Sequence, residues 1–237
     1  MIPKIIHYCW FGKNPLPDSA KKCVESWKKF CPDYEIKEWN ENNFDINCMP
    51  FVKEAYEAKK FAFVSDVARL MVVNENGGVY FDTDVEMIRN IDFLLKYKGF
   101  LGFENKNYVA TGLGFGAEMN SYFLNEMIEK YKSIHFKNED GSLNLIACPK
   151  INTEIMVDNG LCLNGSYQII KGVAVLPVEY MNPLDSTTGK IKKTNNTITI
   201  HWYSQSWLSL NKKIRSKITR VFHRIFGVDC FSFLKKN

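Results

Sequence analysis

The chain has 237 residues, of which 46% are apolar and 14% aromatic, so it can bury a large core and form one sizeable domain. Its seven cysteines are odd in number and show neither a CxxC pair nor the Cys/His spacing of a zinc site, which argues against a disulfide framework and a structural zinc. The N-terminal apolar run is too short for a signal peptide, and no run approaches about 20 apolar residues, so we expect a cytoplasmic protein without a membrane-spanning helix.

The formal net charge of +5 is unevenly distributed along the chain. Residues 211–237 carry eight Lys or Arg side chains and one acid, Asp229, a balance of +7, which leaves −2 for the first 210 residues. We therefore expect a folded domain over residues 1–210 and a basic segment over residues 211–237.

Helices and strands alternate along the folded domain. Strands are predicted at residues 4–11 and 34–39, with a helix at 17–31 between them. Apolar residues recur at helical spacing from residue 49 and stop at the glycine pair 77–78, which predicts one long helix. Later strands are predicted at 79–84, 99–104, 108–116, 167–177 and 197–203, and later helices at 117–134 and 151–160. This order predicts an α/β sheet with crossover connections.

Two aspartates lie at the end of the predicted strand at 79–84, in the stretch GGVYFDTDVE. Side chains alternate along a strand, so Tyr80, Asp82 and Asp84 share one face, and open α/β sheets bind ligands at the carboxyl ends of their strands. Neighbouring carboxylates repel each other unless a cation lies between them, and such oxygen ligands suit Mg²⁺ or Mn²⁺. The pattern predicts a metal-bound phosphate ester; a solvated acidic turn is the alternative.

A second polar group lies just upstream, in the apolar helical stretch FAFVSDVARLMVV. Asp66 and Arg69 are three residues apart on one helix face, next to Ser65. Buried charges are costly unless they are paired or used. These two side chains therefore form either a mutual salt bridge or polar contacts to a ligand.

The segments IPKIIHYCWFG, SDVARLMVVNENGGVYFDTDVE and ITIHWYSQSW resemble the DXD-containing sugar transferases of glycosyltransferase family 32. Their order is also similar to that in the catalytic domains of glucosylating bacterial toxins. The resemblance covers about 70 residues at the N-terminal side and a short C-terminal block, and it matches little between Lys106 and Asn196. It implies that residues 1–210 form a GT-A catalytic domain, a Rossmann-like mixed sheet flanked by helices. It also implies a nucleotide-sugar donor, a divalent metal (Mn²⁺, with Mg²⁺ as the alternative), and transfer with retention at the anomeric carbon.

The resemblance implies a role for each matched side chain. Trp10 would stack on the uracil ring of a UDP-sugar, with plain core packing as the alternative. Asp66 would accept hydrogen bonds from the donor sugar, and Arg69 would reach the sugar or the diphosphate. Asp84 would ligate the metal directly, and Asp82 would contact the metal shell or the ribose. The other donor-site residues that we predict are Ser65, Tyr80, Thr83, Ser206 and Trp207.

His201 and Glu104 are further candidates. His201 ends an alternating strand, and similarity to other metal-dependent GT-A enzymes implies that it is a third metal ligand, which favours Mn²⁺; a hydrogen-bonded surface histidine is the alternative. Glu104 is the carboxylate that we expect on the acceptor side; the alternative is that it is an ordinary surface glutamate. No nucleophile is recognisable on the other face of the sugar, so we expect front-face transfer. The glycine-rich stretch 108–120 lacks the dinucleotide fingerprint and is expected to form a flexible wall of the donor or acceptor pocket.

Apolar residues recur at steps of three or four between residues 207 and 226, with Lys and Arg between them. This spacing predicts a basic amphipathic helix, which either binds an anionic membrane surface or packs on the domain. Capsule and lipopolysaccharide assembly use polyprenyl-linked or lipid-linked glycans as acceptors, so we expect a peripheral protein at the inner face of the cell membrane. No nucleic-acid recognition module is recognisable, and we expect no nucleic-acid partner.

The sequence thus predicts a retaining transferase that moves a hexose from a UDP-sugar, nominally UDP-galactose, to a lipid-linked oligosaccharide in bacterial capsule or surface polysaccharide synthesis. Two other function classes remain open. A metal-dependent phosphoesterase or nucleotidyltransferase would also use strand-end carboxylates, although the chain lacks the extra acidic cluster of a two-metal site. A noncatalytic carbohydrate-binding protein would keep exposed aromatic residues such as Trp202 but would not need Asp82 and Asp84.

Overall fold

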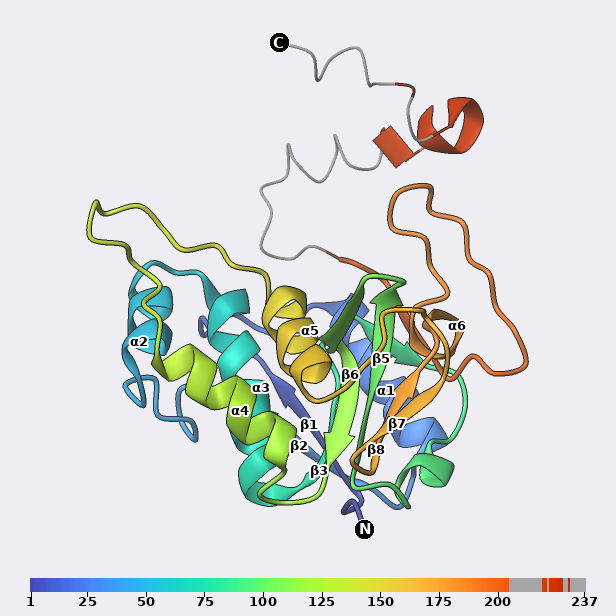
Figure 1. The fold of residues 1–237 in the computed structure, drawn as a ribbon, viewed down its shortest axis with the longest axis horizontal. Coiled ribbons are helices and arrows are strands. Elements are labelled where there is room, and N and C mark those ends of the chain that lie inside the picture. Colours follow the sequence, from blue (N-terminus) through green and yellow to red (C-terminus); the bar gives the residue numbers. More distant parts are fainter. Residues whose placement is uncertain (205–218, 221, 228–229, 231–237) are drawn as a thin grey trace.

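The computed structural model describes residues 1–204, 219–220, 222–227 and 230. A seven-stranded mixed sheet forms the centre of the fold, with strand order β2-β1-β3-β6-β5-β8-β7 (Figure 1). A second sheet consists of two strands: β4, which is the next strand after β3 along the chain, and β9, which is the last one described. The alternation of helices and strands that the sequence predicts is therefore present as a layered α/β fold.

Three strands from the N-terminal half of the chain pair in parallel at one side of the main sheet. Strand β1 (Ile5–Cys9) pairs in parallel with β2 (Glu35–Trp39) on one side and with β3 (Gly78–Tyr80) on the other. The next strand in the sheet, β6 (Tyr108–Ala117), runs antiparallel to β3 and to β5 (Gly99–Asn105). This antiparallel insertion makes the sheet mixed, and it places β6 directly against the strand that leads into the acidic loop.

The far edge of the sheet corrects one prediction. Residues 167–177 form a hairpin and not one strand: β7 (Gln168–Ile170) pairs antiparallel with β8 (Val173–Leu176), and β8 pairs in parallel with β5. The two-residue connection consists of Lys171 and Gly172, with φ angles of 48° and 91°. A two-residue turn with two positive φ angles matches the right-handed twist of the paired strands. The chain therefore reverses between Ile170 and Val173, with apolar residues on both sides of the turn.

Helices cover both faces of the sheet. Helix α1 (Asp18–Phe30) buries Cys23, Val24 and Trp27 in the core on one face. The other face is covered by α2 (Pro50–Glu57), α3 (Phe61–Asn76), α4 (Tyr122–Lys132) and α5 (Cys148–Asp158), whose apolar side chains form the second core. Short helical turns at η1 (Asp92–Leu94) and α6 (Val178–Met181) complete the described elements.

The long helix predicted from residue 49 is wrong, because the chain forms α2 and α3 with a break between them. Lys59 has a φ of 56°, the left-handed conformation that ends many helices. The Lys60 amide donates to the Ala55 carbonyl at 2.9 Å and closes this turn. Helical spacing continues across the break, so periodicity alone did not locate it.

The small sheet brings the end of the described domain back to the acidic loop. Strand β4 (Val85–Met87) pairs antiparallel with β9 (Thr199–His201), with Val85 opposite His201. The Trp27 indole on α1 donates to the Val85 carbonyl at 2.8 Å and so fixes β4 against the core. The seven cysteines all lie in the described part of the chain and are free thiols. Within the described ranges, no helix has the length and apolar character that crossing a membrane requires.

Candidate functional site

The acidic loop begins where β3 ends. The Phe81 amide donates to the His7 carbonyl of β1 at 3.1 Å, and the Phe81 ring is fully buried in the core on the α1 face. On the other face, the Tyr80 hydroxyl donates to Asp82 Oδ1 at 2.9 Å. Tyr80 and Asp82 are therefore joined as the shared face predicts, but the predicted extent of the strand is wrong: β3 ends at Tyr80, and Asp82 and Asp84 lie in the loop that follows. The chain then turns, with the Val85 amide donating to the Asp82 carbonyl at 3.0 Å.

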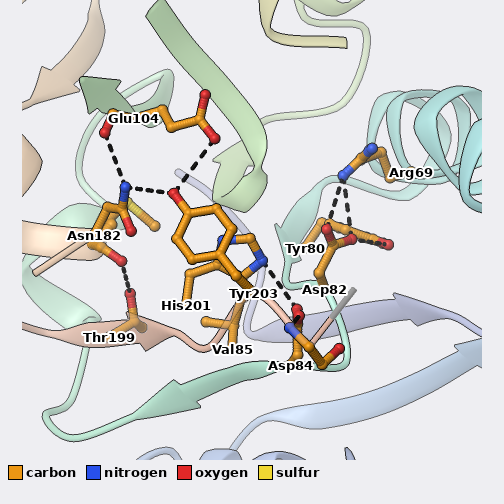
Figure 2. A network of polar contacts seen from close by, with 12 residues as sticks. Arg69, Tyr80, Asp82, Asp84, Val85, Glu104, Asn182, Thr199, His201 and Tyr203 are labelled. Carbon is orange, nitrogen blue, oxygen red and sulfur yellow. Dashed lines mark hydrogen bonds and ion pairs between the residues drawn. The ribbon is translucent and has the colours of Figure 1, made fainter. Parts of the chain in front are cut away.

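Asp84 is held from the opposite side by the strand that follows much later in the sequence. Its Oδ1 lies 3.0 Å from His201 Nε2, and its Oδ2 accepts a hydrogen bond from the Ser204 amide at 2.8 Å (Figure 2). Both side chains are largely buried, at 18% and 13% exposed for Asp84 and His201. Burial acts to raise the pKa of Asp84, but the imidazole and the Ser204 amide outweigh it and hold that pKa well below its usual range.

Asp82, Asp84 and His201 form a cluster in which one ligand atom of each lies within 4.8 Å of the others. Burial raises the pKa of Asp82, Arg69 opposes this shift, and Asp84 adds to it. A cation would relieve the repulsion between the two carboxylates. His201 Nδ1 is buried and has no hydrogen-bond partner in the described part of the chain. Two carboxylates and an imidazole are a donor set for a divalent transition metal, so these residues fit Mn²⁺ better than Mg²⁺.

Arg69 connects this cluster to helix α3. Its side chain is only 3% exposed and forms an ion pair with Asp66 one turn earlier. Its Nη1 also lies 3.2 and 3.3 Å from the two carboxylate oxygens of Asp82 (Figure 2). The guanidinium lies over the Tyr80 ring at 5.6 Å, and Nη2 lies 3.6 Å from Cys148 Sγ at the start of α5. The mutual salt bridge that the sequence left open is therefore present, and Arg69 also reaches the acidic loop. Contact of these two side chains with a ligand stays a prediction.

The glycine-rich stretch at residues 108–120 is largely a strand, so the prediction of a flexible wall is wrong. Residues 109–117 are buried in β6. A Cβ atom on Gly112 would lie 2.8 Å from Asp82 Oδ2 and 3.1 Å from Arg69 Nη1. The absence of a side chain at Gly112 therefore leaves space for the Arg69–Asp82 ion pair. Gly112 lies on β6, so the central strand of the sheet forms one side of the site.

We expect Gly112→Ala to weaken the proposed metal and donor site while the chain still folds. At 2.8 Å from Asp82 Oδ2 the added methyl is too close for van der Waals contact, so the Asp82 carboxylate must shift. We expect a loss of up to about 10²-fold in rate, which is the cost of a misplacement of about 1 Å. The measurement is turnover of a nucleotide sugar together with a urea unfolding curve. Gly102→Ala on the neighbouring strand β5 is the control, since Gly102 has no positive φ and the three atoms nearest to an added Cβ all belong to the flexible Met181 side chain, the closest at 3.1 Å. Equal activity of the Gly112→Ala variant and the wild type would contradict this role.

The remaining candidate residues are distributed as follows. Trp10 follows β1, donates from Nε1 to the Asn14 carbonyl at 2.6 Å and packs partly against the core. Ser65 and Thr83 are half-buried on α3 and in the acidic loop. Glu104, near the end of β5, lies on the His201 side of the site, where its carboxylate accepts from the Tyr203 hydroxyl at 3.4 Å. Ser206 and Trp207 lie outside the described residues.

Three residues at the site were not among the predicted ones. Tyr203 packs against His201, and Asn182 at the end of α6 donates to the Tyr203 hydroxyl at 2.6 Å. Cys148 contacts Arg69 from α5. Tyr203 lies inside the matched stretch ITIHWYSQSW, so that motif carried a signal for it. Asn182 and Cys148 carry no local signal, because only the packing of α6 and α5 against the sheet brings them here.

Comparison with known proteins matches part of the chain. Residues 17–101 match the family model "Glycosyltransferase sugar-binding region containing DXD motif". An inositol phosphoceramide mannosyltransferase of Schizosaccharomyces pombe is 32% identical over 100 residues, which cover 40% of this chain and 28% of that protein. An uncharacterized glycosyltransferase of Acanthamoeba polyphaga mimivirus is 32% identical over 105 residues, which cover 40% of each protein. The matches thus span less than half the length of either relative.

Among solved structures, the PaToxG glycosyltransferase superposes with a TM-score of 0.51 and 20% sequence identity, covering 66% of this chain and 69% of that chain. At this identity the likeness concerns the fold. The mixed sheet with helices on both faces is GT-A-like, and the predicted fold class is confirmed for the described domain. Most of the predicted C-terminal basic helix lies outside the described residues.

Proposed function

We propose that the protein is a divalent-metal-dependent glycosyltransferase, because residues 17–101 match the model of glycosyltransferase sugar-binding regions that contain a DXD motif. The donor is a nucleotide sugar, nominally UDP-galactose, and the acceptor is a lipid-linked glycan. The observation that carries this proposal is the meeting of Asp82, Asp84 and His201 within 4.8 Å, beside the buried Asp66–Arg69 pair. The name of the yeast relative adds support for a lipid acceptor and directs attention to mannosyl donors.

Asp82, Asp84 and His201 would hold the metal, which when bound supplies positive charge against the negative charge that develops on the departing diphosphate. Arg69 contributes a second, permanent positive charge near Asp82. Its guanidinium is held by Asp66 on one side and Asp82 on the other, so its direction is fixed before the donor arrives. Such preorganisation is what makes a charge effective in a partly dry site.

The other proposed roles follow the same face of the site. Asp66, at 13% exposed, accepts hydrogen bonds from donor sugar hydroxyls, and Tyr80 lines the pocket beneath it. Trp10 stacks on the uracil ring, with Ser65, Thr83, Ser206 and Trp207 as further donor contacts. Glu104 lies on the acceptor side. The sugar transfers from the front face with retention, and the departing phosphate takes the proton of the acceptor hydroxyl.

The proposed division of the chain is a catalytic domain at residues 1–210 and a basic amphipathic segment at residues 211–237. The basic segment carries a balance of +7 and supports a peripheral location on an anionic membrane, at the inner face of the cell membrane. That location suits a polyprenyl-linked or lipid-linked acceptor in surface polysaccharide synthesis.

A donor panel tests the proposal. The purified chain is incubated with UDP-galactose, UDP-glucose, UDP-N-acetylhexosamines and GDP-mannose, in Mn²⁺, in Mg²⁺ and after chelation, and release of the nucleotide diphosphate is measured. We expect release from one donor, largest in Mn²⁺ and absent after chelation. Metal-dependent cleavage of simple phosphate esters would instead favour a phosphoesterase, and sugar binding without turnover would favour a carbohydrate-binding protein.

A further inference from the structure

The segment at residues 201–204 folds over Asp84 and contacts it at three points. His201 Nε2 lies 3.0 Å from Oδ1, the Trp202 amide donates to the Asp84 carbonyl at 3.0 Å, and the Ser204 amide donates to Oδ2 at 2.8 Å. Both carboxylate oxygens and the backbone carbonyl of Asp84 are therefore contacted by three of the four residues of this segment. The position of this segment decides how Asp84 and His201 face each other.

Tyr203 is the residue at which this segment turns. Its φ is 49°, the left-handed region that a bulky side chain rarely adopts. A residue persists in this conformation only when its surroundings hold it there. The turn lies between the Trp202 and Ser204 amides, and both of these amides donate to Asp84.

The surroundings that hold Tyr203 come from two other elements (Figure 2). Its hydroxyl accepts from Asn182 Nδ2 at 2.6 Å and donates to Glu104 Oε1 at 3.4 Å. The same Asn182 nitrogen donates to the Glu104 backbone carbonyl at 2.9 Å, which ties the end of α6 to β5. The Tyr203 ring packs on the His201 ring, with centroids 4.2 Å apart and an interplanar angle of 48°. Tyr203 thus connects the Asn182–Glu104 contact to the His201 imidazole.

We propose that Tyr203 is a positioning residue for the metal site. Its ring fixes the rotation of the His201 imidazole, and its left-handed backbone sets the Ser204 amide against Asp84. Asn182 and Glu104 act through the Tyr203 hydroxyl. Partners of metal ligands that orient them in this way contribute about 10-fold to 100-fold to metal affinity. This inference rests on the proposed function, since it assigns a role toward the metal that Asp82, Asp84 and His201 would hold.

The test is Mn²⁺ binding to the full chain without any donor, measured by isothermal titration calorimetry on the Tyr203→Phe and Tyr203→Ala variants. We expect Tyr203→Ala to raise the Kd for Mn²⁺ by about 10-fold to 100-fold and Tyr203→Phe, which keeps the ring, by about 3-fold to 10-fold. Tyr167→Phe is the matched control, because it removes a tyrosine hydroxyl that donates to the Tyr97 hydroxyl at 2.8 Å and not to a residue of the metal site. Its Kd should equal that of the wild type.

Turnover gives a second readout that a merely structural role would not move. In Tyr203→Phe, the Mn²⁺ concentration for half-maximal turnover should rise, while kcat at saturating Mn²⁺ stays within about twofold of the wild type, as expected for a residue that acts on metal binding. An unchanged Mn²⁺ Kd in a folded Tyr203→Ala or Tyr203→Phe variant overturns the inference. Metal binding by the wild type with no donor turned over would refute the proposed transferase and leave the Tyr203 result standing, so the two failures are distinguishable.

Discussion

Asp84→Asn is expected to lower Mn²⁺-dependent turnover of the nucleotide sugar by about 10³-fold or more, the scale of losing one preorganised electrostatic group at a reacting centre. Asparagine keeps the shape of the side chain but removes the negative charge that a divalent cation requires. It also weakens the contact to His201, whose Nε2 lies 3.0 Å from the carboxylate. The measurement is steady-state release of the nucleotide diphosphate from the best donor, with the Mn²⁺ Kd measured in parallel.

The Asp84→Asn variant should still fold, because an amide oxygen can accept the hydrogen bond that the Ser204 amide now donates to Oδ2. Asp158→Asn is the matched control: this aspartate is exposed at the end of α5, and its substitution should leave turnover unchanged. If Asp84→Asn retains more than a tenth of wild-type turnover, Asp84 is not a ligand of a catalytic metal and the proposed function loses its main support.

Arg69→Met is expected to destabilise the protein by about 3 kcal/mol, the lower end of the cost of removing one partner from a buried ion pair. The substitution leaves the Asp66 and Asp82 carboxylates without their shared counterion. Asp66 is only 13% exposed, so its unpaired charge would be costly. Asp82 is 31% exposed, so solvent screens part of its charge, and we therefore use the lower end of the range. The measurement is the free energy of unfolding from urea denaturation. Turnover should fall as well, since the variant lacks the positive charge that we propose acts on the donor.

A double-mutant cycle separates pairing from loss of volume. Adding Asp66→Asn to Arg69→Met removes one of the two uncompensated charges, so the double variant should be less destabilised than the sum of the single ones. Arg89→Met is the control: that arginine is exposed and contacts only the Asn195 backbone carbonyl among the described hydrogen bonds, so the expected change is within about 0.5 kcal/mol. Additive free energies would contradict a mutual ion pair.

Local patterns predicted the parts of the site that lie close together in sequence. Alternation along one strand places Tyr80 and Asp82 on the same face, and the structure joins them by a hydrogen bond of 2.9 Å. Spacing of three residues on one helix pairs Asp66 with Arg69. The second feature depends only on the geometry of one helix, and the first joins residues two positions apart across the end of one strand, so both are local in sequence.

Two of the element boundaries that were wrong share one physical cause. A lysine with a positive φ lies at each of these two places. Lys59, with a φ of 56°, lies in the break between α2 and α3, and Lys171, with a φ of 48°, lies in the hairpin turn between β7 and β8. Lysine gives no sequence signal for a left-handed conformation, in contrast to glycine or asparagine. Apolar spacing continues through both turns, so periodicity extended each element too far. Only Gly172 offered a hint of the hairpin.

The sequence by itself determined that a strand ends in an acidic loop and that a charged pair precedes it on a mostly buried helix. The tertiary structure alone decided that Arg69 reaches Asp82, that Gly112 leaves room for this contact, and that the 201–204 segment closes over Asp84. These contacts join residues 13 to 120 positions apart. They depend on strand order and register, with β6 beside β3 and β9 beside β4, and the periodicity of one segment carries no information about which other segment becomes its neighbour.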